Sequence, residues 1–180
     1  FDSDNGVIVC GYAKSNDTNE SSRIYSTSNG GESWDIVGSG PATNIIKGVV
    51  YVSSDVGFFC YDYVKGMDSN LYKTDDGGKT FAKVMLEEQE LDSSAANPQG
   101  QETETKTDSG KNGADSSEQL RWGDVYKEAL TPVVDSTGII TIYLTQGKNA
   151  VYNDGKTAAK YQSSDKGSTW KYIGQVEIKD

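Results

Sequence analysis

The chain has 180 residues, a formal net charge of −10 and no histidine. The lack of histidine excludes a histidine general base, a histidine-ligated metal and a Ser-His-Asp triad, and the acidic balance argues against nucleic acid and anionic membrane surfaces as partners. No apolar run approaches the roughly 18 residues of a membrane span, so we expect no membrane insertion, while 20 glycines and 11 tyrosines favour short strands joined by turns.

The sequence repeats one arrangement of strands and turns in residues 1–39, 40–86 and 120–180. In each repeat, a strand and a turn that ends in glycine are followed by an apolar strand, a longer loop, a third strand, a second turn and a last strand. The first repeat starts too close to its turn to hold a complete first strand. The turn glycines are, in chain order, Gly6, Gly57 and Gly138.

The second turn of each repeat has a common eight-residue frame. In chain order the copies read Thr-Ser-Asn-Gly-Gly-Glu-Ser-Trp (27–34), Thr-Asp-Asp-Gly-Gly-Lys-Thr-Phe (74–81) and Ser-Ser-Asp-Lys-Gly-Ser-Thr-Trp (163–170). The third residue can accept hydrogen bonds from amides of its own turn, the glycine at the fifth supplies a positive φ, and the aromatic residue at the eighth buries apolar area. We expect these structural roles for Asn29, Gly31, Trp34, Asp76, Gly78, Phe81, Asp165, Gly167 and Trp170.

Residues 87–119 separate the second repeat from the third and contain almost no apolar side chains. A segment of this composition cannot bury enough surface to offset the entropy lost on ordering it. We therefore predict that it is an acidic, disordered insertion between two folded units.

One stretch at the start of the third repeat brings Arg, Trp, Asp and Tyr together within six residues. It contains Arg121, Trp122, Asp124 and Tyr126, which we consider as candidate ligand-binding residues. They can form an aromatic platform with polar neighbours, an arrangement with which proteins hold sugar rings. In the alternative interpretation, Trp122 and Tyr126 pack beneath the edge of a sheet while Arg121 and Asp124 pair at the surface.

Three aspartates near predicted strand ends or loops, Asp62, Asp68 and Asp124, are candidates for a carboxylate pair that acts on a glycosidic bond. Their ordinary interpretation is as solvated loop acids, and the sequence selects no pair. The loop at residues 152–155 lacks the alternating acidic ligands of a calcium site. We therefore assign no catalytic residue, no metal site and no cofactor.

The two cysteines, Cys10 and Cys60, are too few for a disulfide framework. They follow the turn glycines Gly6 and Gly57 by four and three residues, so they should lie on opposite faces of equivalent strands. We expect both to be buried as small apolar side chains.

The eight-residue frame resembles the Asp-box, also called the bacterial neuraminidase repeat, of sialidases and other β-propeller proteins. The resemblance implies an all-β fold of antiparallel four-stranded propeller blades at residues 1–39, 40–86 and 120–180, with structural roles for the box residues. Three blades cannot close a ring, because propellers usually have four to eight. We therefore expect either a portion of a larger propeller or a ring completed by a second copy. The residues expected on the uncovered faces are Val7, Val9, Ile173 and Val176.

The resemblance also implies an extracellular or cell-surface protein. A sialidase needs three converging arginines, but this chain has only Arg23 and Arg121. Other Asp-box propellers, such as those that degrade xyloglucan, use paired carboxylates. We favour a non-catalytic module that recognises a glycan or a protein, or acts as a scaffold. The alternatives are a portion of a sialidase-like or xyloglucanase-like glycoside hydrolase with catalytic residues largely outside this chain, and an assembly or sorting factor that binds only protein.

Overall fold

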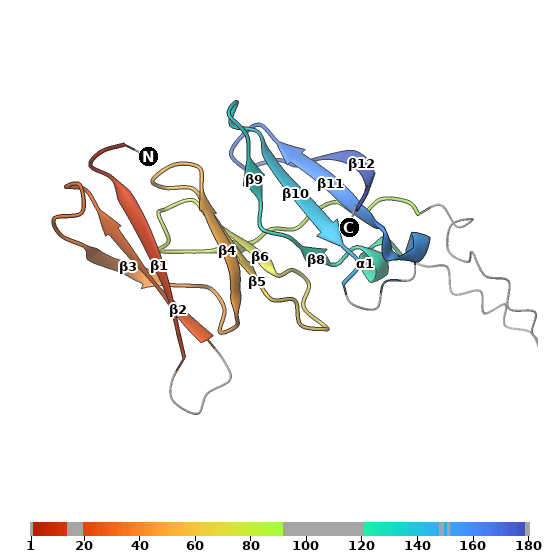
Figure 1. The fold of residues 1–180 in the computed structure, drawn as a ribbon, viewed down its shortest axis with the longest axis horizontal. Helices are drawn as coiled ribbons and strands as arrows, with labels where there is room; N and C mark the ends of the chain where they lie inside the picture. The colour runs from red at the N-terminus through yellow and green to blue at the C-terminus, as the bar shows by residue number, and fades with distance from the viewer. Residues whose placement is uncertain (1, 14–19, 92–120, 148–149, 151, 179–180) are drawn as a thin grey trace, which may run out of the picture.

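The computed structural model describes residues 2–13, 20–91, 121–147, 150 and 152–178. Its strands form three separate antiparallel sheets that follow one another along the chain (Figure 1). These residues include a single-turn helix, α1 (Trp122–Val125), and none of their helices has the length and apolar character that a membrane span requires. The predicted all-β fold with antiparallel sheets is confirmed.

The first sheet consists of β1 (Gly6–Ala13), β2 (Glu20–Thr27) and β3 (Asp35–Ser39), in that spatial order. Among the described residues, β1 pairs only with β2, so its other edge carries no strand. The corresponding strands of the other two sheets are paired on both edges.

The second sheet contains β4 (Ile46–Tyr51), β5 (Gly57–Tyr61), β6 (Leu71–Thr74) and β7 (Ala82–Lys83), again in sequence order. Every residue of β5 is buried. A strand that is apolar on both faces is typical of a sheet covered on both sides, and the second sheet is the middle layer of the molecule (Figure 1).

The third sheet has the order β12-β11-β10, and two short strands share the remaining edge of β10. These two strands are separated by residues 130–132, which include Pro132, and proline has no backbone N–H to donate to the neighbouring strand. A turn labelled η2 (Tyr152–Gly155) precedes β11. The strands are β8 (Glu128–Ala129), β9 (Val133–Val134), β10 (Ile140–Thr145), β11 (Thr157–Ser163) and β12 (Lys171–Glu177).

A hydrophobic cluster joins the first sheet to the second. The fully buried side chains Ile24, Phe59 and Tyr61 form its centre, and Val7 and Val9 pack against them. We expected Val7 and Val9 on an uncovered face, and this expectation was wrong because they point toward the second sheet. Side chains alternate along a strand, so the uncovered side of β1 carries their neighbours instead.

Ile8, Cys10 and Tyr12 are the residues on that uncovered side of β1. The exposure of Cys10 contradicts the expected burial of both cysteines, whereas Cys60 is buried between the second and third sheets. At the other end of the chain, Ile173 is exposed as expected and Val176 is half-buried.

A second hydrophobic cluster joins the second sheet to the third. Its buried members come from β5 and β6 on one side and from β8 and β10 on the other. Burial of the thiol raises the pKa of Cys60 to about 11, so this cysteine is a packing residue and not a nucleophile. The cluster contains Val56, Phe58, Cys60, Leu71, Val84, Ala129, Ile140 and Ile142.

Asn70 ties these two sheets together with hydrogen bonds. Its Oδ1 accepts from the backbone N–H of Ala129 (2.8 Å), and its Nδ2 donates to the carbonyls of Ala129 (2.9 Å) and Tyr61 (2.8 Å). The side chain is 1% exposed, so water does not compete for these bonds.

We expect Asn70→Ala to lower the free energy of unfolding by about 2 kcal/mol, because removing one partner leaves a buried backbone donor unsatisfied at roughly 1–3 kcal/mol. Urea denaturation measures the change. Asn44→Ala is the control, since the Asn44 amide donates to the Asp62 carbonyl (2.8 Å) in a less buried place. An equal loss in both variants would contradict the role given to Asn70.

Residues 84–91 leave β7 and run along the third sheet toward α1 (Figure 1). A third hydrophobic cluster joins α1 to the third sheet and contains Trp122, Val125, Tyr126, Tyr152, Ala159 and Tyr161. Leu86 and Leu91 pack against it, and the hydroxyl of Tyr161 donates to the carbonyl of Glu87 (2.7 Å). Of the predicted insertion at residues 87–119, only 87–91 lie in the described part of the chain, and of these Glu87 and Leu91 contact the third sheet or the aromatic side chains packed on it.

Candidate functional site

The aspartate of the eight-residue turn binds the turn's own donors. Asp165 accepts hydrogen bonds from the backbone N–H groups of Ser168 (3.0 Å) and Thr169 (2.9 Å) and from the Thr169 hydroxyl (2.6 Å). Asp76 makes the same contacts in the second copy of the turn. In the first copy, Asn29 Oδ1 accepts from the amide N–H of the seventh residue at 3.0 Å. These acceptors are engaged within their turns, as the sequence suggested.

Sequence reasoning gave no role to the first residue of the frame, although it is Ser or Thr in all three copies. Its hydroxyl accepts a hydrogen bond from the backbone N–H of the glycine at the fifth position and donates to the residue at the third. The hydroxyl-to-glycine distances are 3.0 Å for Thr27–Gly31, 2.8 Å for Thr74–Gly78 and 2.8 Å for Ser163–Gly167. The repeated hydroxyl was the signal that could have predicted this bond.

The glycine at the fifth position has a positive φ in every copy, as expected: +89° at Gly31, +104° at Gly78 and +77° at Gly167. Two of these glycines also lie against the preceding sheet. A Cβ at Gly78 would lie 2.9 Å from Ile24 Cδ1, and a Cβ at Gly167 would lie 2.5 Å from Phe58 Cζ. The turns therefore connect neighbouring sheets as well as closing their own hairpins.

The hydrogen bonds from the Thr80 and Thr169 hydroxyls hold the pKa values of Asp76 and Asp165 well below the usual 3.8. A lowered pKa stabilises the fold at pH values above 3.8, and this contribution is lost as the pH falls from there toward the folded-state pKa. We expect the Asp76→Asn/Asp165→Asn double variant to lose much of this acid sensitivity, because an amide does not titrate.

Melting temperatures between pH 7 and pH 2 measure the effect. The double variant should melt below the parent at pH 7, and the two curves should converge in acid. Asn29 shows that the turn accepts an amide, since its Nδ2 donates to the Ser33 hydroxyl (2.9 Å). Asp2, Asp68 and Asp135 also have lowered pKa values, which leaves a residual acid dependence. Parallel curves would contradict the prediction.

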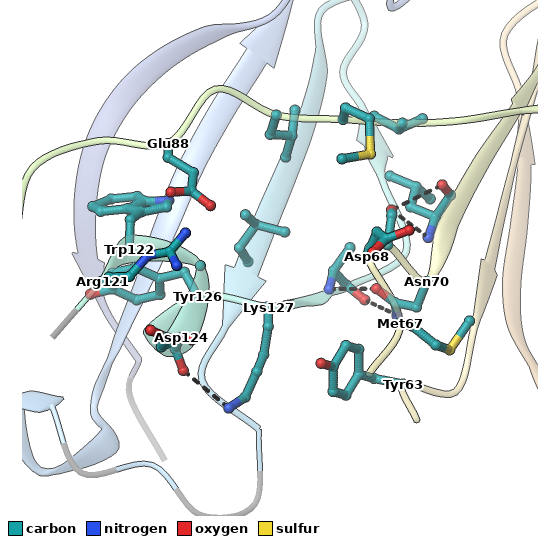
Figure 2. A pocket seen from close by; sticks show the side chains of 18 residues that line it. Tyr63, Met67, Asp68, Asn70, Glu88, Arg121, Trp122, Asp124, Tyr126 and Lys127 are labelled. Carbon is teal, nitrogen blue, oxygen red and sulfur yellow. Dashed lines mark hydrogen bonds between the residues drawn. The ribbon is translucent and has the colours of Figure 1, made fainter. Parts of the chain in front are cut away.

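A pocket of about 340 Å³ lies between the second and third sheets (Figure 2). The loop that follows β5 forms one side, residues 84–88 form the second, and α1 with its flanking residues forms the third. Asn70 lies at the point where the two sheets meet inside it.

All four candidate ligand-binding residues line this pocket. Trp122 and Tyr126 are only 4% and 2% exposed, however, because they pack on each other and on Tyr152 and Tyr172. An open aromatic platform is therefore absent from this stretch, and the rings form a wall.

The polar members of the stretch remain exposed. Arg121 makes no ion pair with another described residue, and the backbone carbonyl of Asp124 accepts from Lys127 Nζ (3.0 Å). The surface pair expected between Arg121 and Asp124 does not form.

The pocket also contains residues that sequence reasoning missed. Tyr63 and Met67, both half-buried, come from the loop after β5 (Figure 2). Glu88 comes from the acidic segment, and its carboxylate lies so close to Gly123 that a Cβ there would be 2.5 Å from Oε1. No sequence signal distinguishes Glu88 from the neighbouring glutamates, because its position depends on how residues 84–91 cross the third sheet.

Two of the three candidate carboxylates, Asp68 and Asp124, line the pocket, whereas Asp62 pairs with Lys47 (2.9 Å) elsewhere. The hydrogen bond from Lys83 (2.9 Å) lowers the pKa of Asp68. A general acid in glycoside hydrolysis needs a raised pKa. Asp68 therefore does not suit that role.

No protein-family model matches this chain, and no curated protein matches its sequence. Within the described residues, no three cysteine, aspartate or glutamate side chains come together as a metal site. The arrangement instead offers a guanidinium, an ammonium and carboxylates around a concave surface with one half-buried tyrosine, which suits hydrogen bonding to a polar ligand.

Proposed function

We propose that this chain is an Asp-box β-propeller module of an extracellular or cell-surface protein, with its three sheets as blades, and that it recognises a glycan or a protein without catalysing a reaction. The observation that carries the proposal is the pocket between the second and third sheets. Three of its exposed charged groups, Arg121, Asp124 and Glu88, form no ion pair with one another or with other described residues. They are free to bind a ligand.

The shape of the pocket favours a glycan unit over a flat protein surface. Its volume lies at the lower end of the roughly 300–1,000 Å³ found for small-molecule sites, whereas a stable protein interface covers about 800 Å² per partner. Hydroxyl groups of a sugar can donate to the carboxylates of Asp124 and Glu88 and accept from Arg121. The wall of buried rings gives these groups a rigid support.

A titration of the full chain with neutral and acidic oligosaccharides, followed by amide chemical shifts, tests this proposal. Shifts should centre on α1 and residues 63–70. Arg121→Gln should weaken binding about tenfold or more, the effect of losing a charge-assisted hydrogen bond. Arg23→Gln is the matched control, because it removes the other arginine, which lies on the first sheet. Equal affinities of the two variants, or no binding at millimolar concentrations, would overturn the proposal.

A second candidate function, a portion of a glycoside hydrolase, draws support from one feature. Asp68 comes from the loop between β5 and β6, Asp124 comes from α1, and both line one pocket (Figure 2). Incubation with xyloglucan and with a sialoside, followed by detection of released reducing ends or sialic acid, separates the two functions. Cleavage that disappears in Asp124→Asn would favour the hydrolase. The sialidase form is disfavoured, because Arg23 lies in β2 of the first sheet and Arg121 immediately precedes α1, so the two do not converge.

A further inference from the structure

The first sheet has an apolar face that no described residue covers. We call it the outer face, and its strand residues are Ile8, Cys10, Tyr12, Arg23, Tyr25 and Ile36. Ile8, Tyr25 and Ile36 lie opposite one another on the three strands, and Ile8 and Ile36 are 43% and 63% exposed. Arg23 lies over the Tyr12 ring at 5.6 Å, and it is the only charged side chain of the set. A contiguous apolar patch of this kind indicates an interaction surface.

The repeat shows what covers this face in the other two sheets. Ile8 stands two residues after its turn glycine, as do Phe59 and Ile140, which are fully buried. Phe59 packs against the first sheet and Ile140 packs against the second. Equivalent residues thus point toward the sheet that precedes their own.

Tyrosine occupies an equivalent position in all three sheets, two residues before the eight-residue turn. Tyr72 packs in the cluster between the first and second sheets, and Tyr161 is 1% exposed on the face of the third sheet that carries Ile142. Tyr25 is the counterpart on the outer face. The outer face therefore has the residues of an inter-sheet contact and lacks only the sheet that would cover it.

The glycines at the fifth position of the eight-residue turns also show what is missing from the outer face. Gly78 and Gly167 each lie against a large apolar side chain of the preceding sheet, Ile24 and Phe58 respectively. At Gly31 the nearest atoms to a Cβ belong to Trp34 of its own turn, at 3.7 Å or more. The place that Ile24 and Phe58 take in the other two contacts is open here.

The far end of the molecule does not complement the outer face. Ile24 and Leu71, three residues before their turns, are buried in the two inter-sheet contacts, and Lys160 stands at this position in the third sheet. Three residues after the turn glycine, the first two sheets have the packed side chains of Val9 and Cys60, whereas the third sheet has Thr141. Polar residues at these two positions are typical of the terminal unit of a stack. A second copy that stacked its third sheet on the outer face would bury this lysine and threonine.

We propose that the outer face docks a further sheet of the same repeat type. This sheet carries apolar side chains at the two positions where the third sheet has Thr141 and Lys160. One of these apolar side chains packs against Gly31. The edge of β1 that carries no strand among the described residues is part of the same surface, whereas β5 and β10 are paired on both edges. Pairing of two identical outer faces is disfavoured, because it would bury two Arg23 side chains on a surface whose strand residues include no acidic partner. The docking depends only on sheet stacking, so it can fail or succeed independently of the proposed glycan recognition.

A donor variant tests the proposal by giving the third sheet the missing apolar side chains. It carries Thr141→Val and Lys160→Leu, with Ile36→Asp added so that its own outer face is blocked. Mixed with the unmodified chain, the donor should form a 1:1 complex with twice the 19.4 kDa mass in sedimentation velocity. Docking should also protect Cys10 of the isotope-labelled unmodified chain from a maleimide, since Cys10 is exposed on this face.

Two controls make the result specific. The Ile36→Asp variant, with its third sheet unchanged, should not bind the unmodified chain. A receiver with Ile8→Asp/Ile36→Asp should bind neither the donor nor the Ile36→Asp variant. Near-ultraviolet circular dichroism verifies that each variant folds. If the donor with Lys160→Leu does not fold, a second donor with Lys160→Ile takes its place. The proposal is overturned if a folded donor forms no complex, if the donor binds the blocked receiver equally well, or if the unmodified chain dimerises and protects Cys10 without a donor.

Discussion

Phe58→Ala is expected to lower the free energy of unfolding by about 3–5 kcal/mol, the range for removing a fully buried phenylalanine. Phe58 is 0% exposed, and its ring packs edge-on against Trp170 of the third sheet at 6.0 Å between centroids. It also fills the space opposite Gly167, where no side chain of the third sheet can replace it. Alanine therefore leaves a cavity that both sheets border, within the hydrophobic cluster that joins them.

Urea denaturation followed by tryptophan fluorescence measures this loss. Ile36→Ala is the control, because Ile36 is exposed and surface substitutions usually change stability by no more than about 0.5 kcal/mol. Trp34 lies in the first repeat and Trp170 in the third, so single-tryptophan versions show whether the third sheet unfolds separately when Phe58 is removed. A loss below about 1 kcal/mol, near the average for point mutants, would mean that the two sheets do not depend on this contact.

The local structure of the turns could be predicted from the sequence because its causes are local. Asp76 and Asp165 bind amides three and four residues further along the chain, and the positive φ of Gly78 is a property of one residue. The strands that flank the turns follow from the same reasoning. Each of these features is decided within eight residues, so the pattern of residue types was sufficient.

The contacts between sheets could not be predicted, because they join residues far apart in the chain. Asn70 binds Ala129 across 59 residues, and nothing in either neighbourhood indicates the pairing. The burial of Trp122 depends on Tyr172 from β12 and on the course of residues 84–91, of which residues 87–91 belong to the segment that was predicted to be disordered. The candidate pocket was thus identified through one of its three sides only. On that side Trp122 and Tyr126 are buried, as in the alternative interpretation, and do not form an open aromatic platform.

The three glycines at the fifth position of the eight-residue turns differ in one respect that a matched set of substitutions can measure. Alanine at Gly31, Gly78 or Gly167 forces a residue with a Cβ into a left-handed conformation, which costs about 1–2 kcal/mol. At Gly167 the new methyl group also meets the ring of Phe58, a rigid side chain held on both sides, and overpacking of this kind costs roughly 1–3 kcal/mol more. We therefore expect Gly167→Ala to lose about 2–5 kcal/mol and Gly31→Ala only about 1–2 kcal/mol.

Gly78→Ala should fall between the other two, because the atom it meets first is the terminal Cδ1 of Ile24, which can turn aside. Chemical denaturation of the three variants under one condition gives the order directly. Equal losses would show that only the φ angle matters and that the turns do not lock neighbouring sheets together. The expected order, Gly167 above Gly78 above Gly31, identifies the inter-sheet contact as the second role of this glycine. It would also make Gly31→Ala a variant that folds in isolation but cannot receive a further sheet, because its methyl group would occupy the space that the docked side chain requires.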